Sequence, residues 1–330
     1  MIKVEGLKTY FYQGGGILSK VFGKGIRIVY AVDNVNLTIE ERNNFSLVGE
    51  TGCGKSTFGR SILRLVEPTS GKIYFAGQNI LEFNEIEMKK FRRNAQIVMQ
   101  DPRSTLNPRM TAGEIIAEPL RIHGIKKYDD EIQDEVMQLI KKVRLSCDAA
   151  EKYPHEFSGG EARRIGIARA LVLHPRFIVA DELTSGLDVS IAAAILDLMQ
   201  DLQEEFKLTY LWISHDLHMV KYISDIIAIM YLGKIVEIGK AQVISQHPLH
   251  PYSQALFSAI PSVKQSQITK KFILEGEVPS PIHPPSGCHY NTRCQCKLGL
   301  ICETDEPPNQ DAGDGHRVSC HIPLEALNNI

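Results

Sequence analysis

The chain has 330 residues, 43% of them hydrophobic, which is enough for one large domain or two to three smaller ones. Its 37 Lys and Arg residues nearly balance its 39 Asp and Glu residues, so it lacks the overall basic charge typical of nucleic-acid-binding proteins. No apolar run approaches the roughly 18 residues that span a bilayer, and the N-terminus has no signal-peptide pattern, so we expect a cytoplasmic protein.

The N-terminal part of the chain alternates short β-rich runs with turns. The runs at 2–5, 35–40 and 72–75 predict a small antiparallel sheet. Residues 12–29 contain three consecutive glycines followed by Lys and Arg, which predicts a solvated loop insertion.

A glycine-rich stretch at residues 49–57 fills every fixed position of the G-x-x-x-x-G-K-[ST] phosphate loop. It lies between a predicted buried strand at 45–48 and a predicted helix at 57–65. Glycines let backbone N–H groups converge on phosphates, and a helix N-terminus adds partial positive charge. Lys55 would contact the β- and γ-phosphates, and Ser56 would offer its hydroxyl to Mg²⁺. We expect ATP to bind at Gly49, Glu50, Thr51, Gly52, Cys53, Gly54, Lys55, Ser56 and Thr57.

The middle of the chain is predicted to be helical, and it is followed by an apolar strand with an acidic end. Residues 131–143 place apolar side chains on one helical face, so the region 112–155 indicates a helical insertion into the sheet. The strand 177–182 ends in Asp181 and Glu182, which would point in different directions if the extended geometry continued. Asp181 could bind Mg²⁺ while Glu182 polarises the attacking water. Such a pair is often only a solvated strand end, but the phosphate loop upstream favours the catalytic interpretation.

Six motifs occur in an order and spacing that resembles the ATP-binding subunit of an ABC transporter, over about residues 1–260. They are the phosphate loop, Gln100 within 98–102, Phe-Ser-Gly-Gly-Glu at 157–161, the Asp181-Glu182 pair, Ser-Gly-Leu-Asp at 185–188 and Ser-His-Asp at 214–216. The resemblance implies an α/β fold, with a RecA-like P-loop NTPase core, an antiparallel β subdomain, an inserted helical subdomain at about 96–165 and a Cys-rich C-terminal extension. It also implies that two such domains close around ATP, each nucleotide lying between the phosphate loop of one and the signature of the other.

The same resemblance implies the roles of individual residues. Glu182 would be the general base, and Lys55 and His215 would contact the γ-phosphate. Gln100 would join Ser56 and Asp181 around Mg²⁺. The remaining assignments are Ser158, Gly159 and Gly160 for the partner's γ-phosphate, Asp188 for ordering the loop between the two sites, and Tyr10 for stacking on adenine, with Phe11 or Tyr30 as alternatives.

Three positions depart from the family pattern. Glu161 replaces the usual Gln, Leu183 the usual Pro and Gly186 an Ala. These departures leave the catalytic side chains in place, although Glu161 adds a carboxylate near a phosphate-binding helix start, where it would repel ATP.

The C-terminal segment resembles the tail of the di- and oligopeptide importer branch of this family. The similar stretches are His-Pro-Leu-His-Pro-Tyr at 247–252, Ala-Ile-Pro at 259–261, Pro-Ser-Pro at 279–281 and Pro-Pro-Ser-Gly-Cys at 284–288. That branch also includes nickel and oligosaccharide importers, and we expect peptide as the cargo. The proline density predicts an extended linker, and the few apolar positions predict no core of its own.

Five of the seven cysteines lie in this tail. Cytosolic proteins rarely keep disulfides, so clustered thiols indicate a metal site. The spacing of Cys288, Cys294, Cys302 and Cys320 matches the family's iron-sulfur tail, and four thiolates can hold either a [4Fe-4S] cluster or zinc. Cys296 could replace Cys294. We expect the cluster, in a structural role, whereas Cys147 is expected to be a small buried residue.

Together these features predict the ATPase subunit of a peptide importer, with an ATPase domain at 1–262 and an iron-sulfur domain at 263–330. The expected partners are a homologous ATPase subunit in a heterodimer, two transmembrane permease subunits and an extracytoplasmic binding protein, with no nucleic acid. The chain would act at the cytoplasmic face of the membrane. The alternatives are a nickel or oligosaccharide importer ATPase, a soluble ABC protein acting on DNA or ribosomes, or a non-hydrolysing scaffold. Soluble ABC proteins usually fuse two ATPase domains, and a scaffold would be expected to lose Glu182 or His215.

Overall fold

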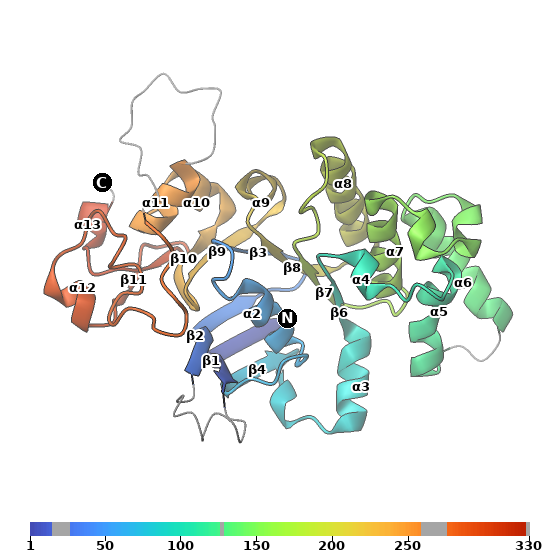
Figure 1. Ribbon diagram of the computed structural model, residues 1–330, viewed down its shortest axis with the longest axis horizontal. Coiled ribbons are helices and arrows are strands. Elements are labelled where there is room, and N and C mark those ends of the chain that lie inside the picture. The colour runs from blue at the N-terminus through green and yellow to red at the C-terminus, as the bar shows by residue number, and fades with distance from the viewer. Residues whose placement is uncertain (15–26, 126–128, 259–275, 328–330) are drawn as a thin grey trace. The chain divides into compact units, whose positions relative to one another are not determined.

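The computed structural model describes residues 1–14, 27–125, 129–258 and 276–327 (Figure 1). These residues form two compact units. The phosphate-loop unit contains Ile2–Ile39, Phe45–Gln78 and the chain from His215 onward, and the signature unit contains Glu40–Asn44 and Asn79–Ser214. The domain boundary predicted near 262 lies outside the described residues and stays a prediction.

An antiparallel sheet forms the N-terminal part of the phosphate-loop unit. β1 (Ile2–Gln13) pairs on one side with β2 (Arg27–Ile39) and on the other with β4 (Ser70–Phe75), and β5 (Gln78–Asn79) follows β4 in the sheet order. This confirms the predicted small sheet. The strands are longer than expected, because residues 27–29 already belong to β2. The rest of the predicted loop insertion, 15–26, lies outside the described residues.

A second sheet in this unit carries the phosphate loop. β3 (Asn44–Val48) runs parallel to β9 (Ile226–Tyr231), which pairs in antiparallel fashion with β10 (Lys234–Lys240). Beyond β10 the sheet continues with β12 (Arg317–Ser319) and β11 (Asn309–Asp311), both from the C-terminal segment. The helices of the main part of this unit are α2 (Lys55–Ile62), α9 (Leu217–Ile223), α10 (Ala241–Gln246) and α11 (Pro251–Ser258).

The signature unit contains three parallel strands that pair in the order β6 (Ala95–Val98), β7 (Phe177–Asp181) and β8 (Thr209–Ser214). Every residue of β7 and β8 is buried, which is typical of parallel strands covered on both faces. The helices of this unit are η1 (Ile80–Glu82), α3 (Glu85–Asn94), α4 (Pro102–Thr105), α5 (Ala112–His123), α6 (Asp129–Lys142), η2 (Cys147–Glu151), η3 (Pro154–Glu156), α7 (Gly159–Leu171) and α8 (Val189–Phe206).

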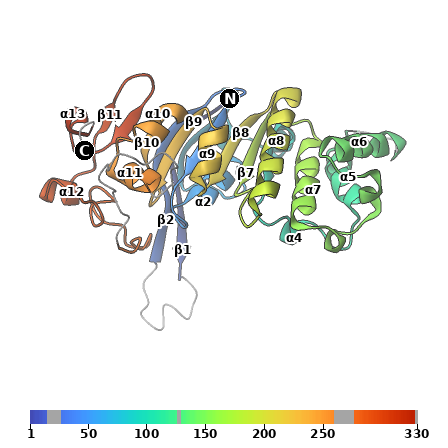
Figure 2. The ribbon, with the colours of Figure 1, turned by 90° about the horizontal axis from the view of Figure 1, so that it is seen from above.

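The predicted helical insertion is confirmed, because α4 to α7 lie in the chain between β6 and β7, which pair directly with each other. Figure 2 shows α5, α6 and α7 gathered into one group. In α6 the apolar stripe Ile132, Val136, Leu139 and Ile140 is buried, as the periodicity predicted. Acidic residues occupy the first turn of α6 and lysines its last, which suits the helix dipole.

The expectation of an extended, coreless tail is wrong in two respects. Residues Pro251–Ser258 form the helix α11, because a proline in the first turn removes an N–H that would have no partner within the helix. The C-terminal segment also builds a small core, whose buried members are Leu249, Val318, Cys320, Ile322 and Leu327. The short helices α12 (Leu300–Thr304) and α13 (Leu324–Leu327) complete this segment.

A buried carboxylate on β10 attaches this segment to the sheet. Glu237 accepts hydrogen bonds from the backbone N–H groups of Leu249 and His250, at 2.8 and 2.9 Å, and lies 2.7 Å from His316 Nε2. Burial lowers the pKa of His250 to about 4, so at neutral pH its Nδ1 is free of a proton and accepts the N–H of Tyr252. The Glu237 side chain therefore holds both the two residues that precede α11 and His316, the residue that precedes β12.

Within the described ranges, no helix combines the length and the apolar character needed to cross a membrane.

Candidate nucleotide-binding site

The phosphate loop turns sharply between β3 and α2. Gly54, with φ +108, precedes α2, and a Cβ at this position would lie 1.9 Å from the carbonyl oxygen of Ala31 on β2. A Cβ at Gly49 would lie 2.2 Å from the carbonyl oxygen of Met230 on β9. Both positions therefore require glycine. In the described part of the chain, no side-chain hydrogen bond caps the start of α2. The N–H groups of its first turn are therefore suited to binding an anion.

Lys55 is buried and held over this loop. Its Nζ donates to the carbonyl oxygens of Gly49, at 2.8 Å, and of Glu50, at 3.0 Å. Ser56 follows on the same helical turn and is partly buried. Cys53 contributes its backbone, since its N–H donates to Glu50 and its carbonyl oxygen accepts from Gly233. The structure thus gives the sequence-predicted loop a fixed shape with a cation at its centre.

Tyr10 lies on β1 in the same unit, half-buried beside Tyr30, with 4.8 Å between the ring centroids. Its hydroxyl donates to Asp33 Oδ1 at 2.5 Å, and burial together with Asp33 raises the pKa of Tyr10. The ring is therefore anchored at its polar end. Phe11, the next candidate for adenine stacking, is 40% exposed.

His215 belongs to the phosphate-loop unit and follows directly after β8. It is exposed, and the next residue, Asp216, begins α9 by accepting the N–H groups of His218 and Met219 at 2.9 and 3.3 Å. This cap fixes the turn on which His215 sits.

In the signature unit, Glu182 leaves the strand that Asp181 ends. Asp181 is 2% exposed, whereas Glu182 has φ +49, so the extended geometry does not continue and simple alternation cannot describe this pair. The Glu182 N–H donates to the carbonyl oxygen of Ile213 at 2.9 Å. Its Oε2 accepts a hydrogen bond from Gln100 Nε2 at 2.8 Å, so the structure joins two predicted catalytic residues that lie 82 positions apart.

Arg163 is a residue that the sequence reasoning missed. Its buried guanidinium, on α7, donates to the carbonyl oxygen of Gln100 at 3.3 Å and also to that of Ser185. It thereby ties the segment after β6 to the segment after β7. A buried arginine is costly unless it is hydrogen-bonded, and only the fold reveals its partners. These residues line a cleft of about 510 Å³ with Asp101, Gly159, Gly186 and Leu187.

The signature begins α7 as predicted. Ser158 is the N-cap, and its Oγ accepts the N–H of Glu161 at 3.3 Å. The Glu161 carboxylate accepts from the Ser158 N–H, at 2.9 Å, and from its hydroxyl, at 2.7 Å, which lowers the pKa of Glu161. Glu161 therefore completes a capping box at the start of the helix, where it is negatively charged at neutral pH.

The other residues predicted near the signature lie on α7 or between β7 and α8. Gly160 is buried within α7 while Gly159 is exposed, and Asp188 is exposed just before α8. Leu183 is buried and Gly186 has φ +70. Cys147, expected to be buried, is exposed on η2, so that expectation is wrong.

The tail cysteines lie near one another in the phosphate-loop unit. The backbone N–H of Cys288 donates to the carbonyl oxygen of Cys302 at 2.9 Å. Burial, together with the neighbouring thiols of Cys296, Cys288 and Cys320, raises the pKa of Cys294 to about 12. Burial likewise raises the pKa of Cys320 to about 11, with Cys288 and Cys302 adding to the shift. In the described part of the chain, however, no three or more His, Cys, Asp or Glu side chains are grouped so as to hold a metal ion.

Comparisons with known proteins agree with this geometry. Residues 32–185 match the ABC transporter family model, and residues 236–302 match that of the oligopeptide/dipeptide transporter C-terminal region. The chain is 44% identical to the oligopeptide transport ATP-binding protein AppF of Bacillus subtilis, over 98% of this chain and 97% of that protein. It is also 44% identical to OppF of Salmonella typhimurium, over 97% and 95% of the two chains.

Among solved structures, the dimeric ATP-binding cassette MJ0796 in a post-hydrolysis state with ADP and Pi is similar, with a TM-score of 0.64 and 29% identity over 73% of this chain and 99% of that one. The fold and the phosphate loop thus define an ATPase of the ABC transporter class. More narrowly, the chain belongs to the family of oligopeptide transport ATP-binding proteins.

Substituting Gly54 by Ala tests whether the close approach of the loop to β2 is required. We expect Gly54→Ala to weaken ATP binding at least about tenfold, because the new methyl group collides with the Ala31 carbonyl oxygen in addition to the roughly 1–2 kcal/mol that a left-handed backbone costs a non-glycine residue. The matched control is Gly52→Ala, which has φ +82 in the same loop but nothing within 4 Å of its Cβ. Titration with a fluorescent ATP analogue measures both variants, and equal affinities for the two would contradict the steric argument.

Proposed function

We propose that this ATPase powers the import of di- or oligopeptides across the cytoplasmic membrane, as a peripheral subunit on the cytoplasmic face. The observation that carries the proposal is the near full-length similarity to AppF and OppF, which includes the oligopeptide/dipeptide C-terminal region at 236–302. The MJ0796 cassette corresponds to only 73% of this chain, so the tail is what favours the peptide branch over other ABC ATPases.

The catalytic steps of the proposal assign proton handling to the signature unit. Glu182 acts as general base toward the attacking water, and the hydrogen bond from Gln100 Nε2 orients its carboxylate. Arg163 supports this pair by holding the Gln100 backbone. Gln100 therefore acts both through its side chain and through a fixed main chain.

The phosphate-loop unit is proposed to bind the nucleotide. Lys55 and His215 stabilise the γ-phosphate, the loop N–H groups hold the phosphates, and Tyr10 stacks on adenine. A hydroxyl and a carboxylate are oxygen ligands that Mg²⁺ accepts, so Ser56 and Asp181, with Gln100, fit the proposed magnesium ligands. When bound, Mg²⁺ neutralises charge on the β- and γ-phosphates.

The proposed assembly contains a second, homologous ATPase subunit, two transmembrane permease subunits and an extracytoplasmic binding protein. Ser158, Gly159 and Gly160 would contact the γ-phosphate on the partner ATPase, and Asp188 would order the loop between the two sites. The helix start and hydroxyl at Ser158 support this role. The charge of Glu161 at the same helix start would weaken ATP there, which favours a heterodimer with unequal sites.

Replacing the general base tests the catalytic assignment. In the reconstituted transporter we expect Glu182→Gln to retain ATP binding and to lower the ATP hydrolysis rate by about 10²–10⁴-fold, the range for losing a general base. Glu156→Gln is the matched control, since Glu156 is an exposed carboxylate of the same unit that only caps the backbone of Tyr153. Hydrolysis by Glu182→Gln at the wild-type rate would show that another group activates the water.

For the tail, we propose a [4Fe-4S] cluster bound by Cys288, Cys294, Cys302 and Cys320. Three of these cysteines lie in the stretch 236–302 that matches the oligopeptide/dipeptide C-terminal region, and the Cys288 N–H donates to the carbonyl oxygen of Cys302 at 2.9 Å, which supports a shared site. Four thiolates can also hold zinc, which is the alternative occupant. Cys296, two residues after Cys294, is the alternative to it as a ligand. A bound cluster would cross-link the tail in addition to its small core.

Metal analysis of protein purified without oxygen tests this assignment. We expect about four iron and four sulfide per chain, with most of both lost in Cys302→Ser. Cys147→Ser is the matched control and should retain the wild-type content, because Cys147 is exposed and lies outside the tail. About one zinc per chain, or no metal, would contradict the cluster and leave the ATPase assignment in place.

A further inference from the structure

The C-terminal segment forms an ion pair with the phosphate loop across 243 residues of sequence. Arg293 donates from Nη1 to Glu50 Oε2 at 2.7 Å and from Nη2 to Glu50 Oε1 at 3.2 Å. The side chain of Arg293 is only 4% exposed, and Glu50 is the second residue of the loop. A two-pronged guanidinium–carboxylate pair fixes direction as well as distance.

The surroundings of this pair hold Glu50 by its main chain too. The Glu50 N–H donates to the hydroxyl of Tyr252 at 2.9 Å, and Arg293 lies 5.9 Å from the ring centroid of Tyr231. Tyr231, Tyr252 and Tyr290 pack together with ring centroids 4.7 to 5.3 Å apart. This aromatic cluster shields the guanidinium of Arg293 from water, while the Glu50 side chain stays 23% exposed.

The position of Glu50 in turn determines that of Lys55. Lys55 Nζ donates to the carbonyl oxygens of Gly49 and Glu50, so a shift of the loop at Glu50 would move the ammonium group. Arg293 therefore acts on the phosphate-binding lysine through one intermediate residue. It also directly precedes Cys294, so the fold of the cysteine-rich segment fixes the arginine.

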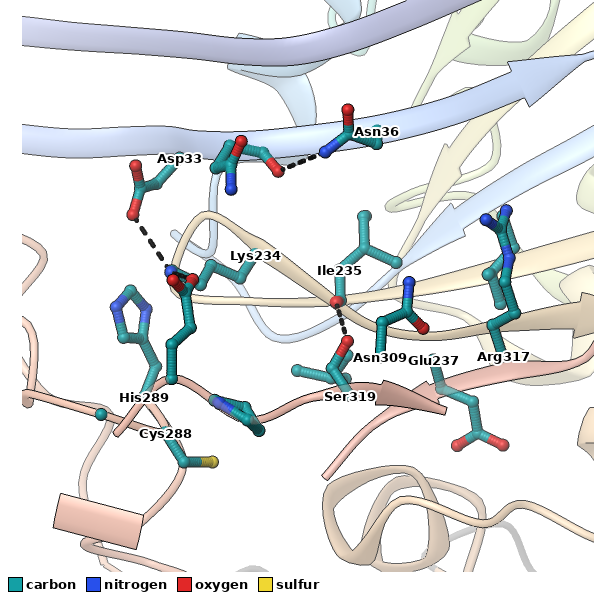
Figure 3. Close-up of a pocket in the computed structure, with 16 residues that line it drawn as sticks. Asp33, Asn36, Lys234, Ile235, Glu237, Cys288, His289, Asn309, Arg317 and Ser319 are labelled. Atoms are coloured by element: carbon teal, nitrogen blue, oxygen red, sulfur yellow. Dashed lines mark hydrogen bonds and ion pairs between the residues drawn. The ribbon is translucent and has the colours of Figure 1, made fainter. Parts of the chain in front are cut away.

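The same segment also contacts β2 and the residues after β9. Lys234 lies 3.4 Å from Asp33 and pairs with Glu306 of the tail, and Asp33 accepts the hydroxyl of Tyr10. Figure 3 shows Asp33 and Lys234 facing each other in a cavity of about 230 Å³ that is also lined by Cys288 and His289. The Tyr30 N–H donates to the carbonyl oxygen of Pro281 at 3.0 Å. The tail thus contacts both the phosphate loop and the strands that carry the candidate adenine site.

We propose that Arg293 is a positioning residue for ATP binding, which holds the phosphate loop through Glu50 in the shape that accepts the triphosphate. This inference rests on the proposed function of that loop. A buried ion pair is weak evidence for stability, because its desolvation offsets much of its attraction. A role in positioning the loop is tested by ATP binding and not by the stability of the fold. If Arg293 has this role, its substitution changes the affinity for ATP more than it changes the hydrolysis rate at saturating ATP.

The test measures the Kd for MgATP of the purified full chain, and KM and kcat for ATP of the reconstituted transporter. We expect Arg293→Met to raise Kd and KM about tenfold, within the range of couplings between linked sites, and to leave kcat within about twofold of wild type. Arg293→Lys should give a smaller increase, because lysine keeps the charge but loses the fork. Glu50→Gln should raise Kd and KM to a similar extent as Arg293→Met does. The double variant should bind ATP no more weakly than the weaker-binding single variant, since both substitutions remove the same interaction.

Lys297→Met is the matched control, because Lys297 pairs with Glu303 inside the tail and should bind ATP as wild type does. Iron, sulfide and the melting temperature report on the fold of each variant. If Arg293→Met does not fold, Glu50→Gln decides, since it leaves the tail sequence intact. Wild-type affinity for MgATP in Arg293→Met or in Glu50→Gln would overturn this inference but not the proposed function of the loop. Failure of the wild-type chain itself to bind MgATP would overturn the proposed function of the loop, and this inference with it.

Discussion

The close packing of the phosphate loop between two strands is the constraint on which the nucleotide site depends. At Gly49 and Gly54 the loop backbone passes so near the carbonyl oxygens of Met230 and Ala31 that no side chain fits. The direction of α2 and the position of Lys55 follow from this contact. Any displacement of β2 or β9 would therefore change the loop, and the structure holds both strands from the C-terminal side. Pro281 accepts a hydrogen bond from β2, and His289 donates to Leu232, the residue after β9.

The two units carry different parts of the chemistry. The phosphate-loop unit holds Lys55 and the N–H groups of the loop, which suit phosphate oxygens, whereas the signature unit holds the acidic pair Asp181 and Glu182. Within the signature unit, Glu182, Gln100 and Arg163 form a connected set, in which each member has a hydrogen-bonding partner in another chain segment. Such a set needs little reorganisation when a water molecule is to be activated, which is the advantage of a preorganised site.

Much of this molecule could be predicted from the sequence, because its motifs are local. The strand, loop and helix around Lys55, the helix start at Ser158 and the apolar stripe of α6 each depend on a short stretch of sequence. The structure has all of them, although the helix after the loop is Lys55–Ile62 and not 57–65. The helix α11 was missed because proline was read as a helix breaker, although Pro251 occupies a first-turn position where it is favourable.

The remaining features depend on contacts that no local pattern encodes. Arg163 and Arg293 look like ordinary charged residues in the sequence, and only the fold brings Gln100 and Glu50 to them. The short C-terminal core was missed because its apolar members, from Leu249 to Leu327, are isolated from one another in the sequence. They form a cluster only when β12 pairs with β10. Glu182 leaves the extended conformation through a positive φ that a strand pattern does not predict.

Coupling of ATP hydrolysis to peptide import can be measured in proteoliposomes that contain the complete transporter. The ATP hydrolysis rate is compared with the binding protein empty, loaded with an oligopeptide or loaded with nickel. We expect only the peptide-loaded binding protein to raise the rate. Stimulation by nickel, or a rate that no loaded binding protein changes, would contradict this coupling.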